Sequence, residues 1–164
     1  MELTRQADYA IRCVLEAARH ERISAREIAV RQELSPSFVG KIISTLAKAG
    51  ILETLRGAAG GVQLGRPPED ISVLDVVQAV QGPIQLNRCV RVPPSCALVE
   101  LCPVSPVIRD AQEAVEGALS VCCDVLLERD RANLAAWDRA LAGSAADRPM
   151  PTAAGSTVER GRPA

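Results

Sequence analysis

Three cysteines stand out in one stretch of the chain, residues 81–106, with the sequence QGPIQLNRCVRVPPSCALVELCPVSP. Cys89, Cys96 and Cys102 are separated by six and then five intervening residues. Thiolates are soft ligands that suit zinc or the iron of an iron–sulfur cluster. An unstructured stretch of this length inside a small domain is usually functional or disordered. The residue types therefore predict a metal or redox site.

The spacing of these cysteines favours a cluster over zinc. Structural zinc takes closely spaced ligand pairs such as C-x2-4-C, and no histidine lies near the loop. Cysteines that hold an iron–sulfur cluster accept wider and less regular spacing, because they approach different irons of one core. Three loop thiols with redox chemistry and no metal form the second interpretation, and zinc the third.

The composition indicates packed helices. The chain has 164 residues, of which 48% are apolar and only 2% aromatic, so the core must consist of Leu, Val, Ile and Ala. No run of about 18 apolar residues is present, and the charged amino end does not read as a signal peptide. We therefore expect a cytoplasmic protein without membrane contact. In that compartment six cysteines favour metal or redox chemistry over structural disulfides.

A helix-turn-helix is predicted in the first third of the chain. Thr4 can cap a first helix over residues 5–20, on whose apolar face Cys13 lies. The Ser24-x-x-Glu27 capping box opens a short second helix. Ser35 and the following proline open a third helix, which ends at Gly50.

A β-hairpin is predicted directly after this motif. Residues 51–55 and 62–65 read as two strands, joined by the glycine-rich tip RGAAGG of residues 56–61. A helix-turn-helix followed at once by such a hairpin is a winged helix. The predicted fold is therefore mainly α with a small β-hairpin wing.

The remaining elements complete a four-part organisation. Ser72 begins a helix to about residue 80, and a long helix follows the cysteine loop from Ser105. Apolar residues continue at helical spacing to Leu126, with Cys122 and Cys123 in mid-helix, and the surplus apolar face predicts a second subunit. We predict a winged-helix domain over residues 1–80, a cluster-binding loop over 81–104, a dimerisation helix with a helical extension over 105–141, and a disordered tail over 142–164.

The helix-turn-helix and the wing predict double-stranded DNA as a partner, and the charge distribution adds only a mild signal. Residues 1–67 carry ten Lys/Arg and seven Asp/Glu, whereas the overall net charge is −1. Side chains near the start of a recognition helix reach base edges and phosphates, and an arginine at the wing tip can enter a minor groove. The predicted DNA contacts are Ser35, Ser37, Gly40, Lys41, Arg56 and Gly57. The alternative is a helix-turn-helix used only for packing or protein contact.

These segments together resemble the IscR, NsrR and RirA type of bacterial transcription regulator. The similarity covers about residues 1–130, and its most specific marks are the wing RG-x2-GG-x2-LGRP and the loop C-x6-C-x5-C. The resemblance implies a homodimer that binds palindromic promoter DNA, most simply as a repressor, and carries one iron–sulfur cluster per subunit. It implies a sensor of nitric oxide, redox state or iron and not an enzyme.

The resemblance also implies a ligand set. Cys89, Cys96 and Cys102 would hold the cluster, and the histidine that IscR-like members place after the third cysteine is absent here. NsrR-like members use an aspartate of the partner's first helix, which matches Asp8 and favours 4Fe–4S over 2Fe–2S. RirA-like iron sensing stays open, because the segments GGVQLGRP and DISVLDVV also resemble that branch. The rival interpretation is a regulator or adaptor without a cluster that uses thiol chemistry or protein contacts.

Overall fold

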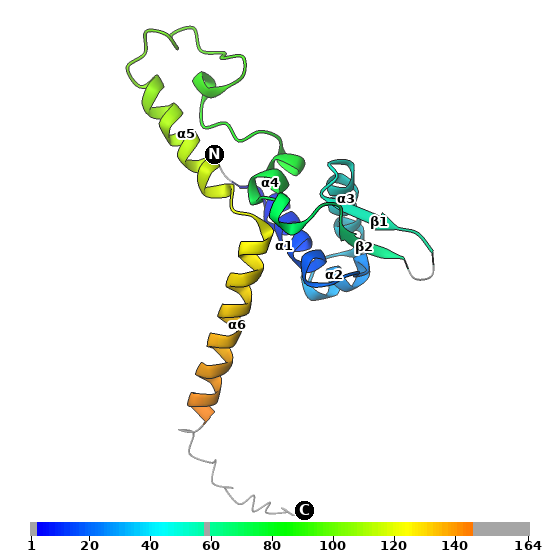
Figure 1. Cartoon of the computed structure of the whole chain (residues 1–164). Helices are drawn as coiled ribbons and strands as arrows, with labels where there is room; N and C mark the ends of the chain where they lie inside the picture. Colours follow the sequence, from blue (N-terminus) through cyan, green and yellow to red (C-terminus); the bar gives the residue numbers. More distant parts are fainter. Residues whose placement is uncertain (1–2, 58–59, 146–164) are drawn as a thin grey trace, which may run out of the picture. The chain divides into compact units, whose positions relative to one another are not determined.

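The structure, a computed structural model, describes residues 3–57 and 60–145, with side chains as far as residue 136. The chain forms two compact units, residues 1–130 and 131–164. In chain order the elements are α1 (Arg5–Arg19), α2 (Ala25–Arg31), α3 (Pro36–Lys48), β1 (Leu52–Leu55), β2 (Gly61–Leu64), the 3-10 turn η1 (Pro68–Asp70), α4 (Val73–Gln81), the 3-10 turn η2 (Arg88–Val90), α5 (Ser105–Leu119) and α6 (Cys123–Ala145) (Figure 1). None of the described helices is long and apolar enough to cross a membrane.

Local capping signals determine where the first helices begin. The Thr4 hydroxyl accepts a hydrogen bond from the Ala7 N–H, and Ser24 and Glu27 form the predicted reciprocal capping box. Such a box satisfies two backbone donors that the start of a helix leaves free. The predicted starts of α1, α2 and α3 are therefore confirmed.

The main core joins α1, α2, α3 and the hairpin. Ala10, Cys13, Val14 and Ala17 of α1 are buried, and with them a row of α3 at helical spacing: Val39, Ile42, Ile43 and Leu46. Burying one large aliphatic side chain contributes about 1.5–3 kcal/mol, so this row fixes which side of α3 faces inward. Tyr9 of α1 and Phe38 of α3 close the edge of the core with their rings at 89° and their centroids 5.8 Å apart. The opposite side of α3 is left to solvent.

The hairpin is a two-stranded antiparallel sheet. Leu52 pairs with Leu64 at its base and Leu55 with Gly61 near its tip. Val62 forms a further bridge with Ile23, the residue before the capping box of α2. The predicted mainly α fold with a β-hairpin wing is confirmed.

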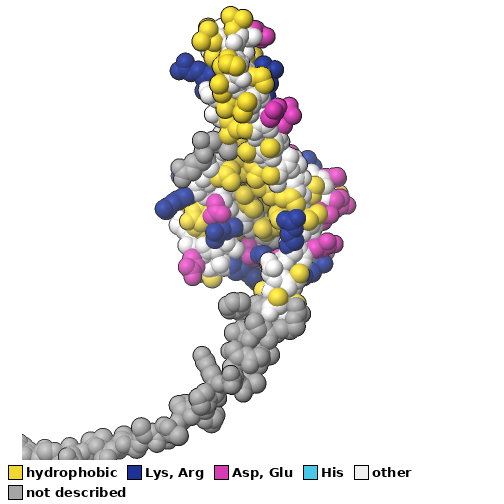
Figure 2. Space-filling model, turned by 90° about the vertical axis from the view of Figure 1, so that its left-hand side faces the viewer, with side chains coloured by type: hydrophobic (Ala, Val, Ile, Leu, Met, Phe, Trp, Pro, Cys, Tyr) yellow, Lys and Arg dark blue, Asp and Glu magenta, His cyan; other side chains and the backbone are white. Residues whose placement is uncertain are grey.

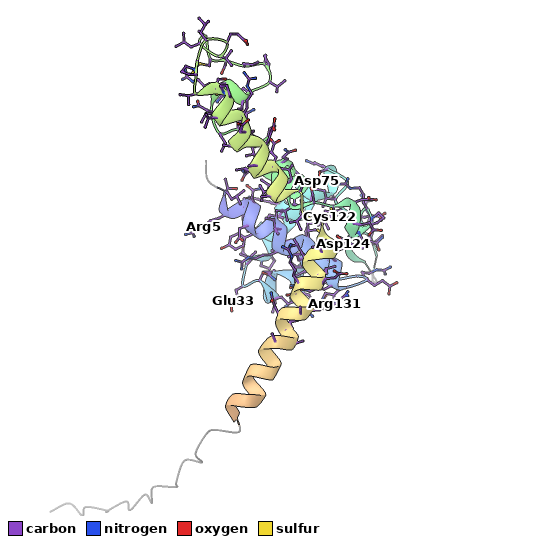
Figure 3. All side chains as sticks on the ribbon, turned by 60° about the vertical axis from the view of Figure 1, so that its left-hand side comes forward. Arg5, Glu33, Asp75, Cys122, Asp124 and Arg131 are labelled. Atoms are coloured by element: carbon purple, nitrogen blue, oxygen red, sulfur yellow. The ribbon has the colours of Figure 1, made fainter. Side chains whose placement is uncertain are left out.

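The predicted continuous helix over residues 105–126 is wrong. α5 ends at Leu119, and α6 begins at Cys123. The backbone between them pairs with the segment before α4: the Val73 N–H donates to the Val121 carbonyl at 3.0 Å and the Cys123 N–H to the Ile71 carbonyl at 2.9 Å. Groups engaged in these bonds cannot also serve a helical ladder, so the helix breaks here. Figure 3 shows Asp75, Cys122 and Asp124 together at this junction.

Two further expectations change with this break. Cys122 and Cys123 lie at the junction instead of mid-helix, with Cys123 buried and Cys122 half-buried. Part of the predicted apolar face packs within this chain, against Val73, Val77 and Ile84: Val115, Leu119 and Leu126. Residues 142–145 of the predicted tail are helical, and residues 146–164 lie outside the described part of the chain.

Candidate functional site

Four of the six predicted DNA contacts lie together at the exposed start of α3. Ser35 is the N-cap, and its hydroxyl accepts a hydrogen bond from the Phe38 N–H at 3.3 Å. Ser37, Gly40 and Lys41 are exposed on the same half of the helix, and open space lies beside Gly40. The N-terminal half of such a helix presents side chains and backbone donors to base edges and phosphates. The geometry suits entry into a major groove.

A strained turn sets the entry into α3. Glu33 has a positive φ of 54°, the left-handed region that glycine favours. Its backbone N–H donates to the Val30 carbonyl, and the Leu34 N–H donates to the Ala29 carbonyl at 2.8 Å. Together these bonds close the end of α2 and redirect the chain toward Ser35.

The wing tip carries Arg56 and Gly57, both exposed. Gly57 has a φ of +104°, and a side chain at Gly60 would collide with the Leu55 carbonyl. The turn therefore depends on glycine at both positions, and Arg56 follows directly after β1 of the hairpin. An exposed guanidinium in this place can reach a phosphate or a minor groove.

The three loop cysteines share one stretch but are not assembled as a ligand set. Cys89 lies in η2, and Cys96 and Cys102 follow in irregular backbone, all three half-buried. In the part of the chain that the structure describes, no three His, Cys, Asp or Glu side chains come together as a metal site. The donors themselves suit a thiophilic metal, because thiolates are soft ligands. The three thiols lie in backbone with little regular structure.

A buried glutamine anchors the entrance of this loop to α5. Gln112 donates to the Ile84 carbonyl and to Glu116 Oε1, each at 2.6 Å, and accepts from the Leu86 N–H at 3.0 Å. Between the loop and this helix lies a cavity of about 370 Å³ that Cys89, Arg109 and Gln112 help to line. Gln112 was not among the predicted site residues, although its spacing from Ile108 and Val115 could have placed it on the inward face of α5.

Asp8 lies on the exposed side of α1, away from the cysteine loop in sequence. Its carboxylate pairs with Arg12, one turn further along the helix, at 3.1 Å. Arg12 in turn lies 5.8 Å from the centre of the Tyr9 ring. Within one subunit Asp8 is therefore a solvated helix charge, and it is accessible to a second subunit.

The cysteines outside the loop are different in kind. Burial raises the pKa of Cys13 from 9.0 to about 12, with a smaller contribution from the nearby Glu16 carboxylate. Burial also raises the pKa of Cys123 to about 11. A thiol becomes reactive as a thiolate, so these two are inert core residues.

Exposed apolar side chains gather over the cysteine loop and α5. Leu101 is 85% exposed and Val107 61%, and Leu98 and Val104 are also open to solvent. Figure 2 shows hydrophobic side chains along this region in the upper part of the view. Contiguous exposed apolar surface of this kind usually marks an interaction site.

The fold and the exposed face of α3 define a winged-helix DNA-binding protein. The family model described as "Rrf2: Iron-dependent Transcriptional regulator" matches residues 3–122. The chain belongs to this family, so the resemblance inferred from the sequence is confirmed. It is a DNA-binding transcriptional regulator and not an enzyme.

Individual relatives agree with this assignment. "Protein aau3" of Rhizobium meliloti is 37% identical over 117 residues, which cover 70% of this chain and 76% of the relative. The HTH-type transcriptional regulator NsrR of Shouchella clausii is 30% identical over 118 residues, covering 70% and 79%. Among solved structures, CymR, the global cysteine regulator of B. subtilis, has a TM-score of 0.65 and 26% identity, covering 79% of this chain and 98% of that one.

Proposed function

We propose that this regulator is a homodimeric repressor whose operator binding is controlled by an iron–sulfur cluster. The observation that carries the proposal is the set of three half-buried thiols on a single irregular loop, beside a cavity against α5. The description of the family as iron-dependent and the similarity to a protein named NsrR support the same chemistry. The signal would be nitric oxide, redox state or iron.

The proposed ligand set rests on the loop thiols and, for the fourth ligand, on the resemblance to NsrR-like regulators. Cys89, Cys96 and Cys102 would supply three thiolates, and Asp8 of the partner subunit the fourth ligand. Asp8 is free to do so because its one pairing, with Arg12, is exposed and such pairs contribute less than about 1 kcal/mol. A bound cluster supplies an inorganic core, 4Fe–4S or 2Fe–2S, that responds to redox state and ligands.

Dimer geometry would transmit the state of the loop to DNA. Two recognition helices must lie about 34 Å apart to engage adjacent half-sites. α5 presents exposed Val107 near its start, and burial of this surface against a second subunit would fix that separation. A coupling of about 1–3 kcal/mol between loop order and DNA affinity would change operator occupancy about 5–150-fold. Ser35, Ser37, Gly40, Lys41, Arg56 and Gly57 would make the DNA contacts.

Anaerobic spectroscopy tests the cluster. Protein purified without oxygen should contain iron and sulfide and show brown visible absorbance, and Cys96→Ala should lack both. Cys122→Ala is the matched control, because this thiol is equally half-buried but lies outside the loop. A Cys96→Ala protein that kept the wild-type spectrum and iron content would refute the ligand assignment.

A second candidate is regulation by thiol chemistry without a metal. It is favoured by the dispersed positions of the three thiols among the described residues and by the 26% identity to the global cysteine regulator CymR. Under this alternative, anaerobic protein contains no iron or sulfide. DNA affinity would then change when the loop thiols are alkylated.

A further inference from the structure

Glu16 is a buried carboxylate that the sequence pattern does not explain. It lies on α1 and is only 5% exposed. A buried carboxylate is costly unless it is paired and hydrogen-bonded, and an apolar side chain of similar size often gives a more stable core. Its place here therefore calls for a role other than packing.

The partners of Glu16 come from two other parts of the fold. Its Oε1 accepts hydrogen bonds from Gln32 Nε2 at 3.0 Å and from Arg19 Nη1 at 2.7 Å. Its Oε2 lies 3.7 Å from Arg31 Nη1 and 3.8 Å from His20 Nε2, and has no hydrogen bond among the described residues. Arg31 is the last residue of α2 and Gln32 its C-cap, so the Glu16 carboxylate contacts the helix-turn-helix where its turn begins.

Gln32 begins the turn that leads from α2 into the recognition helix α3. It is the C-cap of α2, and its backbone N–H donates to the Ile28 carbonyl at 3.0 Å. The strained turn at Glu33 follows directly, and Ser35 then caps α3. A displacement of Gln32 would therefore change the direction in which α3 leaves the core.

Arg19 connects the same carboxylate to the first turns of α6. Its Nε and Nη2 both contact Asp130 Oδ2 at 3.0 Å. The guanidinium therefore bridges Glu16 and Asp130, although Arg19 and Asp130 are 111 positions apart in sequence. α6 begins at the junction where α5 ends, so this bridge reaches the segment that follows the cysteine loop.

We propose that Glu16 positions the recognition helix through Gln32, and that the Arg19–Asp130 ion pair couples this position to α6. The chain Asp130–Arg19–Glu16–Gln32 forms a polar path through the side of the DNA-binding head. DNA binding itself is the established activity of the family, and the path does not depend on which sensing chemistry the loop uses. Its failure can therefore be told apart from failure of the cluster proposal.

The test compares specific with non-specific DNA binding. The probe is a duplex selected by the wild-type protein from a random library, and the reference is an unselected duplex of equal length, both titrated by fluorescence anisotropy at fixed salt. Glu16→Gln should bind the selected duplex about 10-fold more weakly and the unselected one almost unchanged, a ratio in the usual range for coupled sites. Glu21→Gln is the matched control, because it makes the same charge change at an exposed residue beyond α1.

Two outcomes would overturn the positioning role. One is Glu16→Gln binding the selected duplex as tightly as Glu21→Gln does. The other is an equal loss for both duplexes, because partial unfolding lowers the active fraction without changing preference. If Glu16→Gln does not fold, Gln32→Met replaces it, since this variant removes only one hydrogen bond to Glu16. Gln32→Met should lower the preference for the selected duplex about threefold, the loss of one weak contact, and an unchanged preference would refute the role.

A double-mutant cycle tests the coupling to α6. Asp130→Asn removes the ion pair at Arg19, and its effect on specific affinity should become smaller when Gln32→Met is already present. Non-additive effects support the path. Strictly additive effects would show that α6 and the helix-turn-helix respond independently, and would overturn this part of the proposal.

Discussion

Asp8 and Arg12 form a two-point contact on α1, with Arg12 Nη2 3.1 Å from Asp8 Oδ2 and Arg12 Nε 3.4 Å from Asp8 Oδ1. Both side chains are about half exposed, so the pair adds little to the free energy of unfolding. The Asp8 carboxylate stays at the surface of α1. The same group can be a helix charge in one subunit and a ligand to its neighbour, and the two roles predict different phenotypes.

Asp8→Ala should reduce the visible absorbance and iron content of anaerobic protein while the free energy of unfolding of the metal-free protein changes by less than about 0.5 kcal/mol. Arg12→Ala should leave the absorbance in place, because it removes only the local partner. Asp70→Ala, at an exposed residue of η1, serves as the control. Identical spectra for wild type and Asp8→Ala would exclude Asp8 as a ligand.

Arg56→Ala should weaken binding to a selected operator and leave the cluster spectrum unchanged. Loss of one phosphate or minor-groove contact lowers affinity about 10-fold and reduces the salt dependence by about one charge. Arg129→Ala removes an exposed arginine of α6 and should have little effect. The measurement is a gel-shift titration at several salt concentrations. Equal affinities for wild type and Arg56→Ala would exclude the wing contact.

Glu33→Gly should stabilise the metal-free protein by about 0.5–1 kcal/mol. The left-handed conformation at φ 54° costs a residue with a Cβ more than it costs glycine, and part of that gain is offset by the greater freedom of glycine in the unfolded chain. Glu33→Ala keeps the strain and should give no gain. Urea unfolding followed by circular dichroism measures all three proteins. A Glu33→Gly protein no more stable than Glu33→Ala would contradict the turn geometry.

Alkaline pH should destabilise the fold partly through Cys13. Its pKa is 9.0 when unfolded and about 12 when folded, so above pH 9 the unfolded thiol releases its proton first. The stabilisation that Cys13 contributes is therefore complete below pH 9 and lost as the pH rises from 9 toward 12. Cys13→Ala should be less stable at neutral pH, by about 1 kcal/mol for the smaller side chain, and should decline less steeply.

The matched control for this experiment is Cys122→Ala, because Cys122 is half-buried and outside the main core. Its decline with pH should follow that of the wild type, because the buried Cys13 is present in both proteins. Urea midpoints at about pH 7.5 and about pH 10.5 distinguish the variants. Parallel declines for Cys13→Ala and the wild type would rule out this contribution.

Elements with local signals could be predicted from the sequence. The capping box of Ser24 and Glu27 involves residues three positions apart, and the second such box, at Ser72 and Asp75, is equally local. These boxes, the Ser35 cap and proline at the start of α3, and the glycine-rich tip of the wing were enough to predict the DNA-binding head. Cys13 was likewise expected to be buried, because it lies on the apolar face of α1.

Features that depend on distant pairs could not be predicted in this way. The break after Leu119 arises from backbone hydrogen bonds between residues 71–73 and 121–123. The sequence of neither segment indicates that it pairs with the other. Periodicity alone continued the helix through Ser120, because apolar residues keep their spacing across the break. The contact of Arg19 with Asp130 is equally long-range. The sequence alone therefore does not explain why the Glu16 carboxylate is buried.

The paired backbone at residues 71–73 and 121–123 closes a loop of chain that comprises α4, which packs on α1 and α3, and beyond it the cysteine loop and α5. Its two ends leave and re-enter at one point, so changes in the length of the intervening chain cost little: each doubling of a flexible loop adds only about 0.6 kcal/mol of closure entropy. The cysteine-bearing segment could therefore lengthen, shorten or acquire other side chains over evolutionary time while the head kept its stability. This pairing of the two backbone segments favours the diversification of one regulator scaffold toward many signals.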